Sequence, residues 1–538
     1  MKVINLKELS KYNDFTLDMH YALNYCKENK IDKLVVEKDT YIINSDFCFQ
    51  ENLAISNHGY NGPKKIAVLL KDFNDFTIDF SDSILSLNSV TIPLAIINCE
   101  NIKIENLSVE NKAVNILCTK VTAHEKDCII CENLNDFPFT VINNKLYTPC
   151  EGRMLAPIGL NVEFNGKTSA IEKGTSDNTL GVPVDQLDFR LLENNRLQIS
   201  GFKRIPPIGN VLAFNGGQRL CSGFFCENSR SINLNNINIF SSFGMGIISQ
   251  LSSDITLDSF NVCRKGDAYC SVPADATHFV ECTGNITVQN CLFEGMLDDA
   301  LNIHGIYTKI ILKTDKEIFV KEMHPESKGI KLYKAGDTVS IVNKKSLISY
   351  SEKKLVNVEY FNDDLIKLTF SESTDDIILG DSLENLSRNT ADLTFKNNIV
   401  RNNRARGMLI ANKGKTLIEN NYFHTSGSAI RFESDGQYWF ESGGIDDVLI
   451  KNNNFDNCRH GGWGEYVIEC LERAAMEKDK FFHNKITVIG NKFKLLDDKA
   501  VKIDNAEEFC YYDNVFSGDE NISPKISISN VNKVISKE

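Results

Sequence analysis

Proline, glycine and tryptophan are scarce in this chain, and long hydrophobic runs are absent. Only 11 prolines, 32 glycines and 2 tryptophans occur among 538 residues, which excludes collagen-like and linker-dominated chains. No apolar stretch approaches the roughly 18 residues of a membrane-spanning helix, so we expect no membrane span. The 16 cysteines are far fewer than the ~8–10% of a disulfide scaffold. No CxxC pair is repeated at zinc-ribbon spacing.

An excess of basic residues is also absent. The chain holds 59 Lys and Arg against 72 Asp and Glu, which gives a net charge of −13. This balance argues against nucleic acid or an anionic membrane as the main partner, whereas a neutral sugar is compatible. Lys2, Lys7 and Glu8 interrupt any apolar signal-peptide region, so the chain as given is expected to be cytoplasmic. A leader removed before residue 1 would make it secreted or periplasmic, and the sequence carries no sign of oligomeric state.

What the chain does contain is an internal repeat. Apolar and polar residues alternate in each copy, as in a strand with one buried face, and an asparagine then turns the chain. Coils of about this size predict an all-β, right-handed parallel β-helix. A helix over 15–23, with Asp14 as its N-cap, is expected to cover the open end. The copies start at residues 102, 232, 255, 286, 393, 416, 448 and 486.

Two intervals between repeats are too long for one coil. They separate the copies that start at 102 and 232, and those that start at 286 and 393. Each interval is expected to hold a small antiparallel β-barrel-like domain inserted at a corner of the solenoid. The predicted boundaries are 1–112 for the N-terminal β-helix with its cap, 113–220 for the first inserted domain, 221–305 for the central β-helix, 306–388 for the second inserted domain and 389–538 for the C-terminal β-helix.

Two adjacent aspartates, Asp298 and Asp299, break the alternation directly after a coil strand. On a regular strand one of them would be buried, so we expect a bulge or corner that exposes both to one cleft. Asp275 lies 23 residues before Asp298, about one coil, and so falls on the neighbouring layer. A sideways offset could separate the carboxyls by the ~6.5–9.5 Å of an inverting glycosidase. Solvated corner aspartates or a Ca²⁺ site remain alternatives, although no EF-hand-like spacing is present.

Five short segments occur together and in order. They are ADATHF at 274–279, GMLDDALNIHG at 295–305, RARG at 404–407, HTSGSAI at 424–430 and DGQYWFESG at 435–443. Together they resemble glycoside hydrolase family 110, over roughly 230–460 by motif and over the whole chain by architecture.

This resemblance implies an inverting exo-α-1,3-galactosidase that acts on blood-group B and linear α-galactosyl epitopes. The implied fold is a β-helix that carries small barrel insertions, and the implied chemistry needs no metal or cofactor. Carried over by position, the resemblance implies that Asp275, Asp298 and Asp299 are the catalytic carboxylates. Which is the acid and which the base stays open, as does the preference for branched or linear substrates.

Further residues in or near these segments are candidates for sugar binding. Asn302 and His304 follow the aspartate pair at strand spacing, so they should share a face and line the same groove. Trp439 could stack on the apolar face of galactose. The alternatives are corner hydrogen bonds and solvated surface side chains. The predicted substrate-binding residues are Asn302, His304, His278, Arg406, Asp435, Trp439 and Glu441.

Two other functions remain in competition with the galactosidase. A β-helix polygalacturonase or other pectin-type enzyme acts on polyanions and needs a basic cleft or calcium, whereas the candidate segments hold more carboxylates than Lys or Arg. A non-catalytic carbohydrate-binding solenoid has no need of three clustered aspartates. We therefore expect an enzyme whose partner is an oligosaccharide or glycoconjugate.

Overall fold

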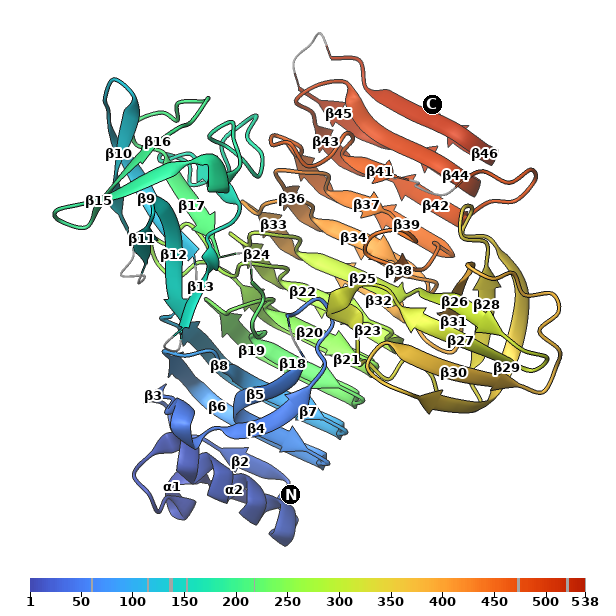
Figure 1. The fold of residues 1–538 in the computed structure, drawn as a ribbon, viewed down its shortest axis with the longest axis horizontal. Helices are drawn as coiled ribbons and strands as arrows, with labels where there is room; N and C mark the ends of the chain where they lie inside the picture. The colour runs from blue at the N-terminus through green and yellow to red at the C-terminus, as the bar shows by residue number, and fades with distance from the viewer. Residues whose placement is uncertain are drawn as a thin grey trace.

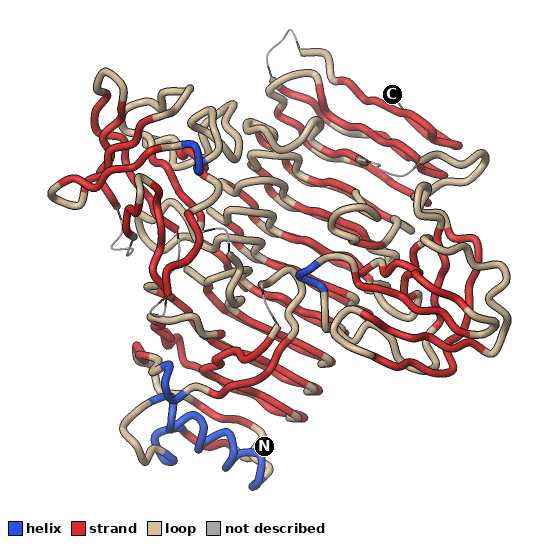
Figure 2. The backbone as a smooth tube through the Cα atoms, viewed as in Figure 1, coloured by secondary structure: helices blue, strands red, loops and turns tan. Residues whose placement is uncertain are grey.

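The protein is an elongated parallel β-helix with two further β-domains on its flanks (Figure 1). A computed structural model describes residues 1–59, 61–113, 116–134, 139–150, 153–216, 218–471, 475–518 and 522–537. Strands dominate, and the longest helix lies at the N-terminal end (Figure 2). The predicted all-β solenoid is therefore confirmed. No helix within the described ranges is long and apolar enough to cross a membrane.

The N-terminal cap consists of α1 (Leu6–Leu9) and α2 (Phe15–Asn29). Asp14 accepts a hydrogen bond from Leu17 N at 3.1 Å and so satisfies a donor at the start of α2. Met19, Ala22 and Leu23 of α2 are buried in the solenoid core. The helix therefore covers the apolar end of the first coil. The other elements in this part of the chain are β1 (Val3–Asn5), β2 (Lys33–Val35), β3 (Thr40–Ile42), the short helix η1 (Ser45–Phe47) and β4 (Phe49–Leu53).

The coils stack their strands in three parallel columns. The first column contains β6 (Asn74–Leu87), β8 (Glu100–Asn111), β19 (Arg230–Ile239), β21 (Ser253–Val262), β23 (Thr283–Gln289), β32 (Asp392–Lys396), β35 (Thr416–Glu419), β39 (Asp447–Lys451), β42 (His483–Ile489), β44 (Lys499–Tyr512) and β46 (Lys525–Lys537). The second contains β24 (Leu292–Glu294), β33 (Ile399–Arg401), β36 (Tyr422–His424), β40 (Asn454–Asp456), β43 (Lys492–Lys494) and β45 (Val515–Ser517).

The third column positions the candidate site. It contains β5 (Gly62–Lys71), β7 (Ile92–Ile97), β18 (Phe224–Glu227), β20 (Ile247–Gln250), β22 (Thr277–Val280), β25 (Leu301–Ile306), β34 (Met408–Ala411), β37 (Ile430–Phe432) and β41 (Ile468–Cys470). The two-residue strand β38 (Glu441–Ser442) pairs antiparallel with the end of β25.

The repeated asparagines bend the chain between the first and second columns. Asn290, Asn420 and Asn452 all adopt a left-handed conformation, with φ of 56–58°, which asparagine tolerates better than most residues. A buried phenylalanine follows each of them three residues later. The rings from Phe423 to Phe455 stack with centroids 5.3 Å apart, and the stack continues through the neighbouring coils.

A polar ladder runs beside this turn, one residue later than the turn asparagines. Asn421 Nδ2 donates to Asn453 Oδ1 at 2.9 Å, and Asn453 Nδ2 donates to Asn491 Oδ1 at 3.0 Å. The turn residue must take up the left-handed conformation, so the next residue is the one that points inward. These buried amides satisfy one another and pin each coil to the next.

Insertion I comprises the strands between β8 and β18. Over its described residues it forms a six-stranded antiparallel sheet and a separate three-stranded sheet. Phe164 of this domain packs edge-on against Tyr269 of the solenoid, with ring centroids 5.9 Å apart. Its elements are β9 (Ile116–His124), β10 (Cys128–Asn133), β11 (Thr140–Ile142), β12 (Lys145–Cys150), β13 (Arg153–Pro157), β14 (Asn161–Phe164), η2 (Val184–Gln186), β15 (Asp188–Leu192), β16 (Arg196–Ser200) and β17 (Val211–Asn215).

Insertion II lies between β25 and β32 and closes as a barrel. Its interior is apolar and is continuous with the buried residues of the adjacent solenoid coils. It follows β25 directly, so it stands beside the coil that carries Asp298 and Asp299. Its elements are β26 (Thr308–Lys313), β27 (Glu317–Glu322), η3 (Pro325–Ser327), β28 (Thr338–Val342), β29 (Ser349–Tyr360), β30 (Leu365–Phe370) and β31 (Ser382–Asn385).

Candidate active site

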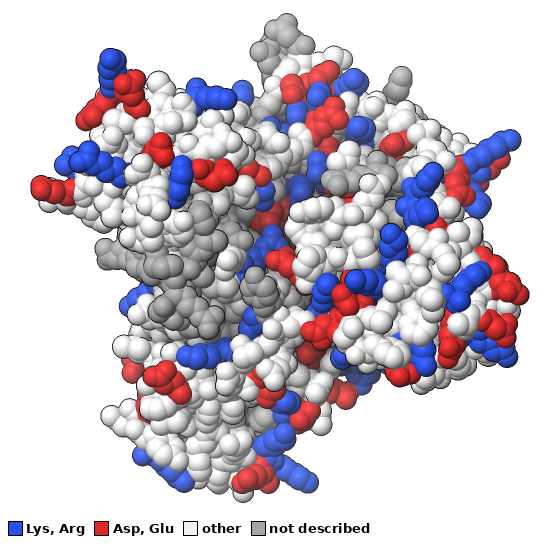
Figure 3. All heavy atoms as spheres, in the orientation of Figure 1, with Lys and Arg blue, Asp and Glu red and all other residues white. Residues whose placement is uncertain are grey.

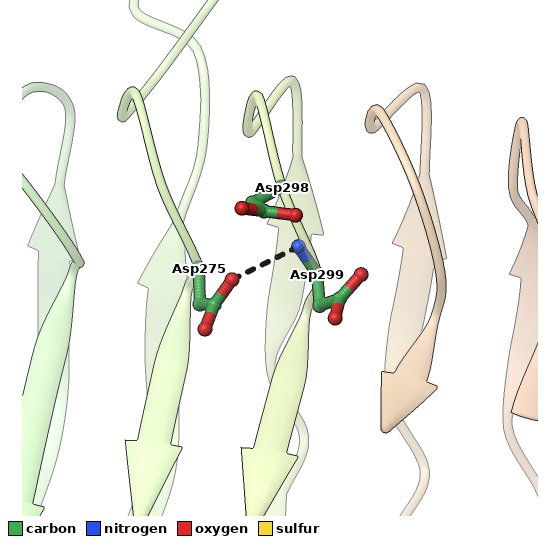
Figure 4. Close-up of side chains that lie close together, drawn as sticks. All are labelled: Asp275, Asp298 and Asp299. Carbon is green, nitrogen blue, oxygen red and sulfur yellow. Dashed lines mark hydrogen bonds between the residues drawn. The ribbon is translucent and has the colours of Figure 1, made fainter. Parts of the chain in front are cut away.

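The structure brings the three predicted aspartates together at the start of two adjacent strands. Asp275 lies just before β22, and Asp298 and Asp299 lie just before β25 on the next coil (Figure 4). Gly295, with φ of 75°, supplies a left-handed turn ahead of the aspartate pair. The backbone N–H of Asp299 then donates to Asp275 Oδ1 at 3.2 Å (Figure 4). A corner thus turns all three carboxyls toward one another.

The three carboxyls are closer than the sequence suggested. One oxygen from each lies within 4.8 Å of the others, whereas a sideways offset was expected to open the ~6.5–9.5 Å gap between a separate acid and base. The hydrogen bond from the Asp299 backbone draws the carboxyls of neighbouring coils together instead. The group is therefore a compact cluster in which the carboxyls influence one another's protonation.

Arginines bind two of the three aspartates. Asp298 accepts hydrogen bonds from Arg219 Nη2 at 2.9 Å and from Arg404 Nη1 at 2.8 Å. Asp299 accepts from the Arg406 backbone N at 2.7 Å and from its Nη2 at 2.6 Å. Arg406 was predicted to contact the sugar. Its guanidinium binds Asp299, and the residue also lines the pocket.

Burial changes the acidity of the two deeper carboxyls. Burial, together with the charge of the neighbouring Asp298 carboxyl, raises the pKa of Asp275 to about 7. Burial also raises the pKa of Asp299 to about 7, against the opposing effect of Arg406. A carboxyl with a pKa near neutrality can either hold or accept a proton at working pH.

A cavity of about 360 Å³ opens beside the aspartates. In the space-filling view, side chains of both charge signs meet in a hollow between the two inserted domains (Figure 3). The predicted residues on its wall are Asp275, Asp298, Asp299, Asn302, Arg406, Asp435, Trp439 and Glu441, and the wall also includes Asn57, Leu160, Asn215, Gln218, Arg219, Pro273, Leu297, Arg404, Leu409, Arg431 and Glu433.

Two predicted sugar contacts lie behind the pocket wall. His278 and His304 are 0% and 1% exposed and do not line the cavity. Strand spacing correctly put His304 on the same face as Asn302, but the ring of His304 turns away from the cavity toward His278. Both histidines lie on the outer face of the solenoid, since Phe279 and Ile303 beside them point into its core, and His278 contacts Asp275 directly.

The segment around Asp435 forms one rim of the pocket. Asp435 accepts from the backbone N–H groups of Gln437, Tyr438 and Trp439 at 2.7–3.0 Å, so its carboxylate shapes this loop. Trp439 is 37% exposed at the rim, and its ring lies 4.7 Å from that of His324 in insertion II. Glu441 reaches the pocket from β38.

Sequence reasoning missed several charged residues at the site. Arg431 and Glu433 line the pocket from β37 and the residues just after it, and Arg431 donates through Nε to Glu469 at 2.7 Å. Their alternating outward positions after the HTSGSAI segment are also typical of a solvated strand flank, which is the interpretation that the sequence alone favours. Arg219 gives no signal in the sequence, because it follows insertion I and lies outside the five segments.

The donor set at the aspartates does not fit a divalent cation. Three carboxylate oxygens lie close enough to contact one ion. Arg219, Arg404 and Arg406 already donate to two of these carboxyls, and positive guanidinium groups would repel a cation. Ca²⁺ also takes six to eight oxygen ligands. That the chemistry needs no metal remains a prediction.

The arrangement suits acid–base cleavage of a glycosidic bond. Clustered carboxyls, two with a pKa near 7, stand at the wall of a pocket that also offers amide, guanidinium and indole groups to a sugar. The fold and the site together define a glycoside hydrolase built on a parallel β-helix.

Comparisons with known proteins identify the family. The chain matches the descriptions GLAA-B beta-barrel domain I over residues 119–212, GLAA-B beta-barrel domain II over 317–383 and right handed beta helix region over 382–507. It is 32% identical to alpha-1,3-galactosidase B of Phocaeicola vulgatus over 75% of this chain and 70% of that protein. It is 29% identical to alpha-1,3-galactosidase B of Parabacteroides distasonis over 91% and 83%. The chain belongs to the α-1,3-galactosidase family.

A solved structure aligns along the whole solenoid at low similarity. The family 28 exopolygalacturonase of Yersinia enterocolitica covers 100% of this chain and 79% of its own, with 12% identity and a TM-score of 0.43. That score is too low to bear on function. The handedness of the solenoid follows from the family description and agrees with the prediction from the repeat.

Proposed function

We propose that this chain is an exo-acting, inverting α-1,3-galactosidase of glycoside hydrolase family 110. Its substrate would be terminal α-1,3-linked galactose on blood-group B-type or linear α-galactosyl glycans. The relatives named above support the bond and the sugar, and the five sequence segments support the family. The observation that carries the proposal is the compact cluster of Asp275, Asp298 and Asp299 at the wall of the pocket.

The acidity of two carboxyls is compatible with single displacement. The nearest oxygens are closer than both the ~6.5–9.5 Å spacing of inverting enzymes and the ~5–5.5 Å spacing of retaining ones, so distance does not choose. Single displacement needs an acid and a base, and burial raises the pKa of both Asp275 and Asp299 to about 7. Such carboxyls suit an acid for the glycosidic oxygen and a base for water.

Sugar recognition would use groups around the cluster. Asn302 Oδ1 is buried and accepts no hydrogen bond from the described residues, so it is available to a sugar hydroxyl. Trp439 offers an exposed indole at the rim, which suits the apolar face of galactose. A bound sugar would give Asn302 Oδ1 a hydrogen-bond donor and the Trp439 indole a stacking partner.

The stereochemical course tests the mechanism directly. Proton NMR of the first-formed product from an α-1,3-galactosyl disaccharide should show β-galactose before mutarotation. Initial α-galactose, or a covalent galactosyl-enzyme trapped with a fluorosugar, would refute single displacement.

Single substitutions test the cluster. Asp275→Asn, Asp298→Asn and Asp299→Asn keep side-chain volume but remove acid–base capacity, so each should lower kcat/KM by at least about 10²-fold. An aryl α-galactoside with a good leaving group should restore activity to the variant that lacks the acid, because departure then needs no proton. The exposed Asp267→Asn is the matched control. Near-normal turnover in all three variants would place the chemistry elsewhere.

Metal removal gives a further test. Exhaustive EDTA treatment should leave activity unchanged, because arginines already neutralise two of the carboxyls. Loss of activity that Ca²⁺ or Mn²⁺ specifically restores would contradict the proposal.

A further inference from the structure

A continuous hydrogen-bonded chain runs behind the pocket wall from Asp275. Asp275 Oδ2 lies 2.7 Å from His278 Nδ1, and His278 Nε2 lies 2.9 Å from His304 Nε2. His304 Nδ1 lies 2.7 Å from the carbonyl oxygen of Gly305. His278 belongs to β22 and His304 to β25, so the chain links two neighbouring coils along the outer face of the solenoid.

The carbonyl at the end fixes where protons can sit. A carbonyl oxygen only accepts, so His304 Nδ1 must carry a proton. The two Nε2 atoms would repel each other without a proton between them, so either His278 or His304 donates there. If a neutral His278 donates through Nε2, its Nδ1 is a bare acceptor and Asp275 must be the protonated partner.

If His304 donates instead, the charges are distributed differently. His304 then carries protons on both nitrogens and is an imidazolium, while His278 donates through Nδ1 to an ionised Asp275. Both arrangements contain the same number of protons. They differ only in whether the mobile proton belongs to Asp275 or to His304.

We propose that Asp275, His278 and His304 form a proton relay that sets the charge of Asp275 from behind the pocket wall. In the shift, the Oδ2–H bond of Asp275 breaks as the Nδ1–H bond of His278 forms. The Nε2–H bond of His278 breaks as the Nε2–H bond of His304 forms. Asp275 thereby becomes a carboxylate and His304 an imidazolium, with no proton exchanged with solvent.

The surroundings stabilise both ends of the shift. Glu441 Oε1 lies 3.5 Å from His304 Nε2 and would offset the charge of an imidazolium. Burial and the neighbouring His304 hold the pKa of His278 well below its usual range, which keeps its ring a neutral carrier. The titratable and charged groups that face His278 are Asp275, Asp298, His58, His304, Arg219 and Glu441.

The catalytic role of the relay rests on the proposed galactosidase function and adds a mechanism for changing the charge of Asp275. A carboxyl that takes a proton from water, or gives one to a glycosidic oxygen, must change charge inside a buried site. The relay would supply that change at Asp275. His278 and His304 would then be positioning residues rather than sugar contacts.

Nitrogen NMR of the free protein, labelled with ring-¹⁵N histidine, tests the proton count without any substrate. We expect His304 Nδ1 to be protonated across the active pH range and one proton to be shared between the two Nε2 atoms. Two unprotonated Nε2 atoms, or an unprotonated His304 Nδ1, would overturn the relay. A lack of galactosidase activity would leave this measurement intact, so the two proposals can fail separately.

Kinetics of His278→Asn test what the relay does. The amide can still hydrogen bond to Asp275 but has no second ring nitrogen to pass a proton onward. We expect kcat to fall about 10-fold or more with little change in KM, and a pH limb of kcat/KM to move. Rates in H₂O/D₂O mixtures should change from a curved dependence, which reports two protons in motion, to a linear one.

The control is His424→Asn, since His424 bonds to the Asp456 carbonyl outside the pocket. We expect this variant to keep the wild-type rates and H₂O/D₂O dependence. A folded His278→Asn enzyme with unchanged pH limbs and isotope dependence would overturn the relay, even if its Tm fell. If His278→Asn does not fold, the NMR result on the wild-type protein decides.

Discussion

Two fully buried glutamates, Glu163 in insertion I and Glu322 in insertion II, have opposite surroundings. Glu163 in insertion I is 0% exposed and accepts hydrogen bonds from Arg204, from Thr179 Oγ1 at 2.9 Å and from Asn210 Nδ2 at 2.7 Å. Glu322 in insertion II is also 0% exposed, but neither carboxyl oxygen has a hydrogen-bond partner among the described residues. Burial raises the pKa of Glu322 to about 9, so this side chain is held as a neutral acid.

The paired glutamate belongs to a network that reaches the candidate site. Thr179, bonded to Glu163, follows Asp177 by two residues, and Asp177 accepts from Arg404 Nε at 2.6 Å and Nη2 at 2.8 Å. Arg404 in turn donates to Asp298. Trp463 Nε1 also donates to Asp177 at 2.8 Å. Insertion I thus supplies a carboxylate that holds Arg404, which lines the pocket.

Insertion II meets the pocket differently. His324 stacks on Trp439, and the backbone N–H of Tyr307 donates to the carbonyl of Phe440 at 2.8 Å. These contacts support the aromatic rim rather than the aspartates. From this difference we propose that insertion I affects mainly the chemistry and insertion II mainly the binding of the glycan.

The largest expected effect comes from breaking the link between insertion I and the cluster. Asp177→Asn removes the carboxylate that orients Arg404, so Asp298 loses a fixed partner. We expect kcat to fall by about 10²-fold, with KM changed much less, because a misplaced catalytic group costs about this much. Steady-state kinetics on an α-1,3-galactosyl disaccharide would measure it.

Asp188→Asn is the matched control, since Asp188 lies in the same domain, is half exposed, and forms its one ion pair among the described residues with Lys145 at 3.1 Å. This variant should be as active as the wild type. An unchanged kcat for Asp177→Asn would mean that insertion I is only a scaffold.

The fold and the position of the aspartates could be predicted from the sequence because both repeat with the period of the coil. Most coils carry their own alternation and turn asparagine, and Asp275 lies one coil before Asp298. Asp177 and Arg219 could not be predicted. They lie 227 and 79 residues from the partners they bind, Arg404 and Asp298, and no period links them. Only the docking of insertion I on the solenoid brings them together.

The two histidines show the limit of strand spacing. Alternation indicates which residues share a face, and it placed His304 with Asn302. It does not tell whether a ring turns toward the cavity or into the wall, because that depends on partners from the neighbouring coil such as His278. For the same reason, alternation alone does not show that the hydrogen-bonded asparagine ladder lies one residue beyond the turn asparagines.

A second experiment contrasts the two buried glutamates through stability. In the unfolded chain a glutamate has a pKa near 4.3, whereas in the folded protein the pKa of Glu322 is about 9. The contribution of Glu322 to the free energy of unfolding is therefore fully present below about pH 4 and is lost as pH rises toward 9. Glu322→Gln removes this loss, so its stability advantage over the wild type should be close to zero near pH 4, grow by up to about 1.4 kcal/mol per pH unit, and reach several kcal/mol at pH 8.

Glu163→Gln is the informative counterpart. It leaves Arg204 without its counter-charge and should destabilise by about 1–3 kcal/mol. Urea unfolding at the two pH values would measure both variants. If the two substitutions shift stability in the same direction, the contrast between the domains is wrong.

The smallest effects are expected at the rim that insertion II supports. Trp439→Ala removes the exposed indole and should raise KM by about 10-fold, or ~1.4 kcal/mol, while kcat stays nearly constant, since stacking contributes mainly to binding. His324→Ala removes only the ring behind that indole, 4.7 Å away, so KM should rise two- to threefold, about 0.5 kcal/mol. In the double variant the His324 effect should vanish, because its partner is gone. A His324 effect that persists without Trp439, or one that falls on kcat, would show that insertion II acts on the chemistry as insertion I does.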